Sequence, residues 1–242
     1  MINVKKLKKL LSYSGFFYNK KKLDKYHYKG NFLSTHSITF NLINKNSKIL
    51  DIGCYDASLA KKIIKKKNCY VDGVDFKRVI NKKILNNFFE FNLNNGLPKQ
   101  INYNKYNYIL MLDVIEHLDN PEKFISNLRK LIKKNKKTKI ILSTPNIAFF
   151  IIRLSLLFGN FNYSEKGILD YTHKRLFTFN SFTNLLINNN FKIEKKIGIP
   201  APFPLVLGKN FISLFMLNFN NFLIKINKKL FSFQMLFIVS FK

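Results

Sequence analysis

The chain has 242 residues, of which 47% are apolar and 23% are charged, a balance typical of a folded globular protein. This length favours one domain and is sufficient for a sizeable hydrophobic core without disulfides or metal ions. The composition therefore argues against a disordered tail, a collagen-like fibre and a disulfide-stapled mini-protein.

Charge is the unusual feature, because 42 basic residues against 13 acidic ones give a net charge of +29. Only four of the basic residues are arginines, the residue whose planar guanidinium grips phosphate at two points. The lysines are spread along the whole chain together with many Asn, Ile and Phe residues, which indicates A/T-rich codons and a solvated lysine surface. We therefore expect no nucleic-acid partner, although this charge also predicts weak attraction to anionic membranes.

Two cysteines, Cys54 and Cys69, stand outside any CxxC or Cys/His cluster, so we predict no metal site and reduced thiols.

The apolar stretch at residues 10–18 lacks a small-residue cleavage site, so no signal peptide is predicted. No window approaches the ~20 uninterrupted apolar residues of a membrane span. The expected location is cytoplasmic, with peripheral association at the inner face of the membrane left open.

The residue pattern in the N-terminal third of the chain predicts a basic arm and a helix, followed by a strand–helix–strand unit. In chain order, the expected elements are an arm over residues 1–30, a helix over 35–44 capped by Ser34, a strand over 48–52, a helix over 57–66 and a strand over 69–75. A strand, a tight glycine turn, a helix and a second strand within about thirty residues make a βαβ unit, which implies a parallel sheet.

The alternation of strands and helices continues to the C-terminus. Further strands are expected over 88–93, 106–112, 139–143, 191–197 and 234–241, with helices over 121–133 and 180–190. This order predicts an α/β fold with a doubly wound, seven-stranded, mostly parallel sheet and an antiparallel edge strand. We assign residues 1–45 to an N-terminal basic arm and helix, and residues 46–242 to one domain.

Two stretches interrupt the alternation, at residues 147–179 and 198–233. We interpret both as insertions, partly helical, that form a lid over the ligand end of the sheet, where the loops of such folds carry function. Within the second, the apolar segment 209–230 fits a lid helix, a dimer contact or a helix at a membrane surface. Of these three, a buried lid helix is favoured, and the other two stay open.

The turn after the first predicted strand, Asp51-Ile-Gly53-Cys54, is a candidate ligand-binding turn, because ligands of doubly wound sheets lie at the carboxyl ends of the strands. Asp75 ends the second strand and is suited to accept hydrogen bonds from both hydroxyls of an adenosine ribose. The turn lacks the GxGxxG pattern, since Tyr55 and Ala57 stand where further glycines are expected. This argues against a dinucleotide ligand and favours an adenosine ligand that has no diphosphate group.

The most specific motif is the string Asp113-Val-Ile-Glu116-His117, which ends the predicted strand over 106–112 and precedes Pro121. Together with the first turn, Asp75 and Ser143-Thr-Pro-Asn146, it resembles the class I S-adenosylmethionine-dependent methyltransferases over residues 30–197. The resemblance implies a Rossmann-like fold, S-adenosylmethionine as cofactor, and methyl transfer by in-line displacement. The segments 170–178 and 200–204 look like a bacterial branch associated with surface glycans, which implies O-methylation of a small-molecule, sugar or lipid-linked acceptor.

The resemblance also implies roles for individual residues. Asp51, Gly53 and Cys54 would form the turn at the methionine part of the cofactor, which Leu112 and Asp113 would flank. Asp75 would hold the ribose, Phe76 would pack on the adenine, and Asn92 and Leu93 would face the adenine edge. The family usually has Asp where Asn92 stands, but the amide oxygen of Asn still accepts a hydrogen bond.

His117, His173 and Arg175 are the candidates for catalysis or acceptor contact, because an oxygen nucleophile benefits from a general base. Each also has a structural alternative: His117 bracing the helix start, and His173 with Arg175 pinning a lid. Two alternative functions stay open at this point. One is methyl transfer to RNA or protein, and the other is a non-catalytic peripheral membrane or assembly protein that retains the fold.

Overall fold

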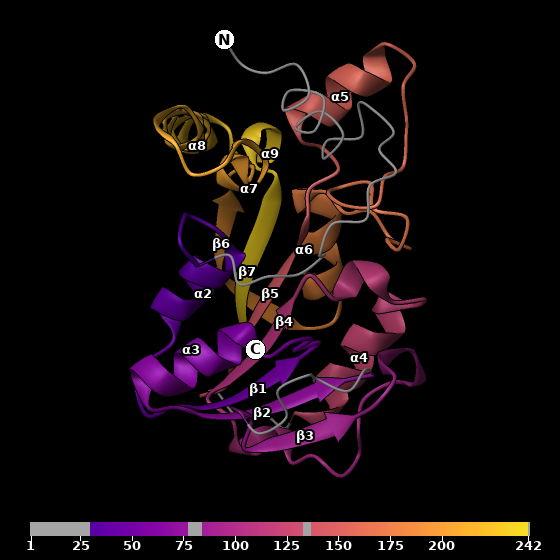
Figure 1. Cartoon of the computed structure of the whole chain (residues 1–242). Coiled ribbons are helices and arrows are strands. Elements are labelled where there is room, and N and C mark those ends of the chain that lie inside the picture. The colour runs from indigo at the N-terminus through magenta and orange to yellow at the C-terminus, as the bar shows by residue number, and fades with distance from the viewer. Residues whose placement is uncertain (1–29, 77–83, 133–136, 242) are drawn as a thin grey trace.

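The computed structural model describes residues 30–76, 84–132 and 137–241, so residues 1–29 of the predicted arm lie outside the described residues. Seven strands form one twisted sheet in the order β3-β2-β1-β4-β5-β7-β6 (Figure 1). They are β1 (Lys48–Ile52), β2 (Tyr70–Asp75), β3 (Asn87–Glu90), β4 (Tyr108–Leu112), β5 (Lys139–Pro145), β6 (Phe191–Ile199) and β7 (Gln234–Phe241).

The sheet confirms the predicted doubly wound, mostly parallel topology with an antiparallel strand at one edge. Strands β1 to β5 pair in parallel, and the edge is formed by the β7–β6 pair, in which β7 runs antiparallel to both neighbours and β6 is outermost. The strand order reverses between β1 and β4, so the chain leaves these two strands toward opposite faces of the sheet, into α3 and α4. In folds of this kind the ligand crevice lies at that switch point.

Helices cover both faces of the sheet (Figure 1). On one face lie α2 (Thr35–Leu42) and α3 (Ser58–Lys67), and on the other α4 (Pro121–Leu131) and α6 (Phe179–Asn188). The expected caps are present: the Ser34 hydroxyl accepts from the Ser37 amide, and the Asn120 side chain accepts from the Lys123 amide ahead of a first-turn proline. Such caps satisfy amide groups that have no partner within the helix.

Burial on both faces explains why the parallel strands read as continuous apolar runs. Alternate strand residues enter opposite cores: Ile49, Val71 and Leu110 pack with α3, while Leu50 and Met111 pack toward α4 and α6. All five side chains are fully buried. Polar side chains therefore do not alternate with apolar ones inside these strands, and even Asp51 and Asp72 are buried, which is the expected signature of a parallel sheet.

One strand is shorter than predicted. The expected strand over 88–93 ends at Glu90, because Asn92 caps a single 3-10 turn, Leu93–Asn95, by accepting a hydrogen bond from the amide of Asn94. Local side-chain capping competes with strand pairing in this way when Asn follows an edge strand. The turn places residues 92–94 beside the carboxyl end of the sheet.

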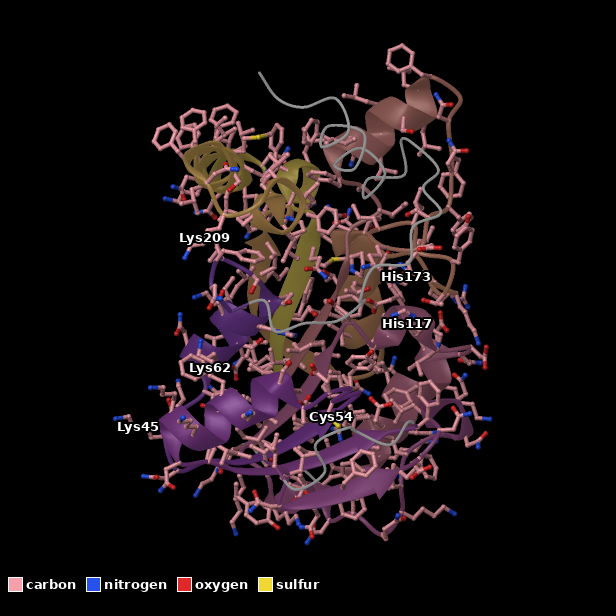
Figure 2. All side chains as sticks on the ribbon, in the orientation of Figure 1. Lys45, Cys54, Lys62, His117, His173 and Lys209 are labelled. Carbon is pink, nitrogen blue, oxygen red and sulfur yellow. The ribbon has the colours of Figure 1, made fainter. Side chains whose placement is uncertain are left out.

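The two inserted segments fold largely as helices, α5 (Phe150–Leu157) in the first and α7 (Phe203–Leu207), α8 (Phe211–Ile226) and α9 (Lys228–Phe231) in the second. Helices α5, α7 and α8 share a third apolar core, and all four helices lie at the same end of the molecule (Figure 1). Leu217 and Ile224 face inward from α8, while Phe rings project outward from the opposite side (Figure 2). Among the described helices, none is both long and apolar enough to cross a bilayer.

Candidate functional site

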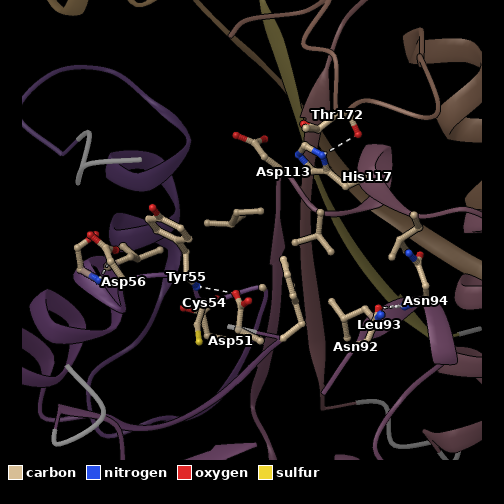
Figure 3. Close-up of a pocket in the computed structure, with 18 of the residues that line it drawn as sticks. Asp51, Cys54, Tyr55, Asp56, Asn92, Leu93, Asn94, Asp113, His117 and Thr172 are labelled. Carbon is tan, nitrogen blue, oxygen red and sulfur yellow. Dashed lines mark hydrogen bonds between the residues drawn. The ribbon is translucent and has the colours of Figure 1, made fainter. Parts of the chain in front are cut away.

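A cavity of about 570 Å³ opens at the carboxyl ends of β1, β2 and β4 (Figure 3). This volume lies within the range of small-molecule sites. The structure brings together at this cavity all nine residues that the sequence assigned to a cofactor: Asp51, Gly53, Cys54, Asp75, Phe76, Asn92, Leu93, Leu112 and Asp113. Their individual roles toward a ligand stay predictions.

The turn after β1 is built from left-handed backbone. Gly53 has φ +77°, and a Cβ there would lie 2.4 Å from Cγ2 of Val114, so a larger residue would meet both strain and a clash. Tyr55 and Ala57, the residues that replace expected glycines, also have positive φ values of 45° and 55°. A non-glycine residue pays roughly 1–2 kcal/mol for this conformation, so the turn imposes its shape on these side chains.

Two aspartates hold the floor of the cavity. The amide of Tyr55 donates to Oδ2 of Asp75 across 2.8 Å, which joins the turn to the end of β2. Asp51 is almost fully buried. Burial, reinforced by the nearby charges of Asp75 and Asp56, raises the pKa of Asp51 to about 7. Desolvation of this carboxylate favours its neutral form until a positive charge arrives.

Asp113 is held in a fixed orientation just beyond β4. Its φ of 56° is left-handed, and both carboxylate oxygens accept hydrogen bonds, Oδ1 from the Ser143 hydroxyl at 2.6 Å and Oδ2 from Nε2 of Gln234 at 2.7 Å. Ser143 belongs to a motif that the sequence singled out. The sequence carried no signal for Gln234, because it begins β7, 121 residues away.

Cys54 packs against the core side of the turn. Burial, followed by the charges of Asp51 and Asp75, raises the pKa of its thiol far above the ordinary value. Its Sγ lies 2.8 Å from the position that a Cβ on Gly73 would take. A thiol that is buried and held protonated is a weak nucleophile, so Cys54 shapes the cavity wall.

The first insertion reaches the cavity because its chain is pinned to the loop after β4. The amides of Lys174 and Arg175 both donate to the carbonyl oxygen of Glu116, at 2.8 and 3.1 Å. Tyr171, Thr172 and Lys174 consequently line the cavity opposite the turn after β1. The segment 170–178 is recognisable in the sequence, but its contact with the β4 loop is not, because no local pattern encodes that contact.

The three catalytic candidates take different positions. His117 lines the cavity, and its Nδ1 lies 3.1 Å from the Thr172 carbonyl oxygen (Figure 3). His173 lies behind it, with ring centroids 4.8 Å apart, and is not among the described lining residues. The guanidinium of Arg175 lies 3.4 Å from the Glu122 carboxylate on α4, outside the cavity.

Charge distinguishes the cavity from the rest of the molecule. Four of the 13 acidic residues in the chain, Asp51, Asp56, Asp75 and Asp113, line it. The single lysine among the lining residues, Lys174, forms an ion pair with Asp119. An acidic hollow in a strongly basic protein attracts a ligand that carries positive charge, and it opposes a diphosphate.

Comparison with known proteins identifies a family and a fold. The sequence model of a methyltransferase domain family matches residues 26–196, more than half of the chain. No curated protein sequence matches the chain. The match covers all strands from β1 to β5, most of β6 and the first insertion, and therefore the whole cavity.

Solved structures with the same fold share little sequence with this chain. A Burkholderia thailandensis 1,6-didemethyltoxoflavin-N1-methyltransferase with bound 1,6-didemethyltoxoflavin and S-adenosylhomocysteine gives a TM-score of 0.55 at 10% identity, over 86% of this chain and 76% of that one. A SAM-dependent methyltransferase from Aquifex aeolicus gives 0.53 at 12% identity, over 88% and 93%. The [4+2]-cyclase SpnF gives 0.53 at 8% identity, over 85% and 79%. At these identities the likeness shows the fold alone.

Proposed function

Because the chain belongs to the methyltransferase domain family, we propose that it transfers a methyl group from S-adenosylmethionine to an oxygen atom of a small-molecule, sugar or lipid-linked acceptor. The observation that carries this proposal is the acidic cavity at the strand switch point, lined by Asp51, Asp75 and Asp113. S-adenosylmethionine has a sulfonium, an ammonium and one carboxylate group, so its net charge is positive, and it has no phosphate. Its charge therefore matches this cavity, whereas a dinucleotide coenzyme would be repelled.

The lining residues fit the parts of this cofactor. The carboxylate of Asp75 suits the two ribose hydroxyls, and Phe76 follows it at the cavity wall. Asn92 and Leu93 stand at the other side, where the adenine edge would lie. Asp51 and Asp113 are left for the charged methionine end, and Asp113 is already oriented by its two hydrogen-bond donors.

The chemistry required of the chain is mainly positioning. The cofactor supplies an activated methyl group, so the protein has to align an acceptor oxygen with the S–CH3 bond and exclude water. Orientation of this kind contributes at most about 7–11 kcal/mol to lowering the barrier. Tyr171, Thr172, Lys174 and His117 line the cavity opposite the turn after β1, where they would enclose the acceptor.

An exposed apolar surface supports the lipid-linked form of the acceptor. On α8, Phe211, Phe215, Phe219 and Phe222 follow one another at helical spacing and are exposed, Phe211 by 83%. Lys225, Lys228 and Lys229 follow them. An outward apolar face next to lysines is typical of helices that lie at an anionic membrane surface. Such a surface at the inner face of a membrane would bring the cavity to a membrane-bound acceptor.

A methyl-transfer assay tests the function. The full chain is incubated with tritiated-methyl S-adenosylmethionine and separate lipid, glycan, RNA and protein fractions, and Asp75→Ala serves as the binding-deficient control. We expect label in the lipid or glycan fraction with wild type only. Label in RNA or protein would contradict the acceptor class. The absence of transfer together with the absence of S-adenosylhomocysteine binding would contradict the cofactor.

A further inference from the structure

A cluster of three side chains begins at the cavity wall with His117 and extends behind it. Its members come from both sides of the contact between the β4 loop and the first insertion. Glu116 and His117 belong to the short turn Ile115–His117 after β4, and His173 to the insertion. One potential ligand atom from each lies within 4.8 Å of the others. Two imidazoles and one carboxylate at this spacing form a set that binds transition metal ions.

The Glu116 carboxylate gives an independent indication of a ligand. The residue is only 1% exposed, and neither carboxylate oxygen makes a hydrogen bond of ordinary geometry, although the Thr144 hydroxyl, itself without a partner, lies nearby. Buried carboxylates are normally hydrogen-bonded, paired with a cation or bound to a metal. Among the described residues, none supplies a cation to this carboxylate through a salt bridge.

Both histidines are oriented in the way that metal ligands usually are. Nδ1 of His117 lies 3.1 Å from the Thr172 carbonyl oxygen, and Nδ1 of His173 lies 2.8 Å from the Ile168 carbonyl oxygen. A carbonyl oxygen only accepts, so Nδ1 carries the proton on each ring. Nε2 then holds the lone pair, which is the arrangement that outer hydrogen bonds impose on metal-binding imidazoles.

The neighbouring carboxylates of Asp113 and Asp170 already accept hydrogen bonds from other residues, so they do not compete with the cluster for a metal ion. Asp113 accepts from Ser143 and Gln234, and Asp170 accepts from the amide and the hydroxyl of Thr172. Asp170 thereby fixes the turn that presents His173. The arrangement leaves three ligands, with the remaining coordination positions open to water or to an oxygen of a bound molecule.

We propose that Glu116, His117 and His173 bind a divalent first-row transition metal ion, such as Zn²⁺, Mn²⁺ or Fe²⁺, at the acceptor side of the cavity. Imidazole nitrogen favours these ions over Mg²⁺ and Ca²⁺. Bonds of about 2.0–2.2 Å place neighbouring ligand atoms about 3 Å apart, so small side-chain rotations close the set around an ion. His117 connects the site to the cavity, because it belongs to both.

The role of the ion rests on the proposed function, whereas its binding does not. An acceptor hydroxyl that coordinates the ion at an open position would have a lowered pKa. Its O–H bond would break with the proton passing to solvent water. The oxygen would then form a bond to the methyl carbon while the S–C bond breaks, and the electron pair of that bond would stay on sulfur in S-adenosylhomocysteine.

Metal binding is measured on the full chain without an affinity tag, after treatment with a chelator and buffer exchange. Zn²⁺ is titrated calorimetrically, and Co²⁺ is titrated while its visible d–d absorption is recorded. We expect one ion per chain for both metals, and Co²⁺ bands characteristic of mixed nitrogen and oxygen ligation. No saturable binding of either ion to the folded wild type would overturn the proposal.

The variants Glu116→Gln and His173→Gln remove one ligand each and keep the side-chain volume similar. Each should weaken Zn²⁺ at least tenfold, whereas the matched control Asp119→Asn, an exposed acid three residues beyond Glu116, should leave it unchanged. Circular dichroism establishes that the variants fold. If the two ligand variants bind Zn²⁺ as tightly as wild type, the ion is held elsewhere and the assignment fails.

Titration with S-adenosylhomocysteine separates this inference from the proposed function. The chelated wild type should still bind S-adenosylhomocysteine, because none of the three ligands is assigned to the cofactor. Cofactor binding without metal binding would remove the metal site and leave the function. Metal binding without cofactor binding would leave the metal site and contradict the proposed function.

Discussion

The main-chain amide of Tyr55 donates a hydrogen bond to Oδ2 of Asp75 across 2.8 Å. This bond ties the left-handed turn after β1 to the end of β2, which are the two segments that would enclose an adenosine ligand. Asp75 therefore has two tasks. It holds the turn in shape, and it is the proposed acceptor for the ribose hydroxyls.

Asp75→Ala removes the acceptor for both hydroxyls. Hydrogen bonds to a charged group contribute about 1.5–3 kcal/mol each, so we expect the affinity for S-adenosylhomocysteine to fall at least tenfold in a calorimetric titration. Glu194→Ala, which changes an exposed acid on the edge strand β6, far from the lining residues, is the control and should bind like wild type. Equal affinity of Asp75→Ala and wild type would remove Asp75 from the site.

Asp51→Asn tests the buried carboxylate at the methionine end. With its pKa near 7, Asp51 gains its charge between about pH 6 and pH 8, and the charged form is the one that attracts a cationic ligand. Wild-type affinity for S-adenosylmethionine should therefore rise with pH across this window. Asp51→Asn should bind more weakly and without that rise, as measured by calorimetry at several pH values.

The same substitution should stabilise the unliganded protein. The pKa of Asp51 is raised from 3.8 in the reference state to about 7 in the fold, so the native state holds a proton that the unfolded state has lost. Stability then falls as pH rises from about 4 to 7, by up to about 4 kcal/mol from this residue. Urea unfolding at pH 7.5 should give a higher midpoint for Asp51→Asn than for wild type, and a lower midpoint would contradict the burial effect.

Asn92→Asp should strengthen cofactor binding. The Asn92 amide oxygen already accepts from the Asn94 amide, and a carboxylate in its place keeps this cap and offers a charged acceptor to the adenine amino group. Charge-assisted hydrogen bonds are roughly twice as strong as neutral ones, so a gain of a few-fold in S-adenosylhomocysteine affinity is expected. A loss of affinity would mean that the adenine edge lies elsewhere.

Arg175→Ala separates substrate contact from positioning. The guanidinium is paired with Glu122 outside the cavity, and both partners are exposed, so the pair contributes about 0–1 kcal/mol to stability. We expect Arg175→Ala and Glu122→Ala to have the same small effect on melting temperature and turnover. A large loss of turnover in Arg175→Ala alone would show that the guanidinium contacts the acceptor.

The outward face of α8 is tested with lipid vesicles. Replacement of Phe215 and Phe219 by Ser should reduce co-sedimentation with anionic vesicles, because two exposed rings no longer enter the interface. The control is Ile187→Ser, an exposed apolar residue on α6. Equal sedimentation of all three proteins would show that charge alone holds the chain to the vesicles, or that another surface does.

Much of the fold could be predicted because local chemistry decides it. The runs that became β1, β2 and β4 are buried on both faces, and the caps Ser34 and Asn120 are readable from three or four residues. The end of β3 was predicted wrongly, because Asn92 can either continue a strand or cap a following turn, and in the structure it caps the turn Leu93–Asn95. The competing outcomes differ by a single side-chain hydrogen bond.

Two parts of the site that the sequence did not reveal depend on distant contacts. Gln234 fixes Asp113 from 121 residues away. His173 meets His117 only because the Glu116 carbonyl accepts from the amides of the insertion. The shape of the first turn was also hidden, because Tyr55 and Ala57 take a conformation that their residue types disfavour.

A crystal structure of the chain with S-adenosylhomocysteine tests the central claim most directly. The account predicts the nucleoside in the cavity beside Gly53, with both ribose hydroxyls within hydrogen-bonding distance of the Asp75 carboxylate. A ligand bound outside this cavity, or a cavity that remains closed to the ligand at saturating concentration, would contradict it.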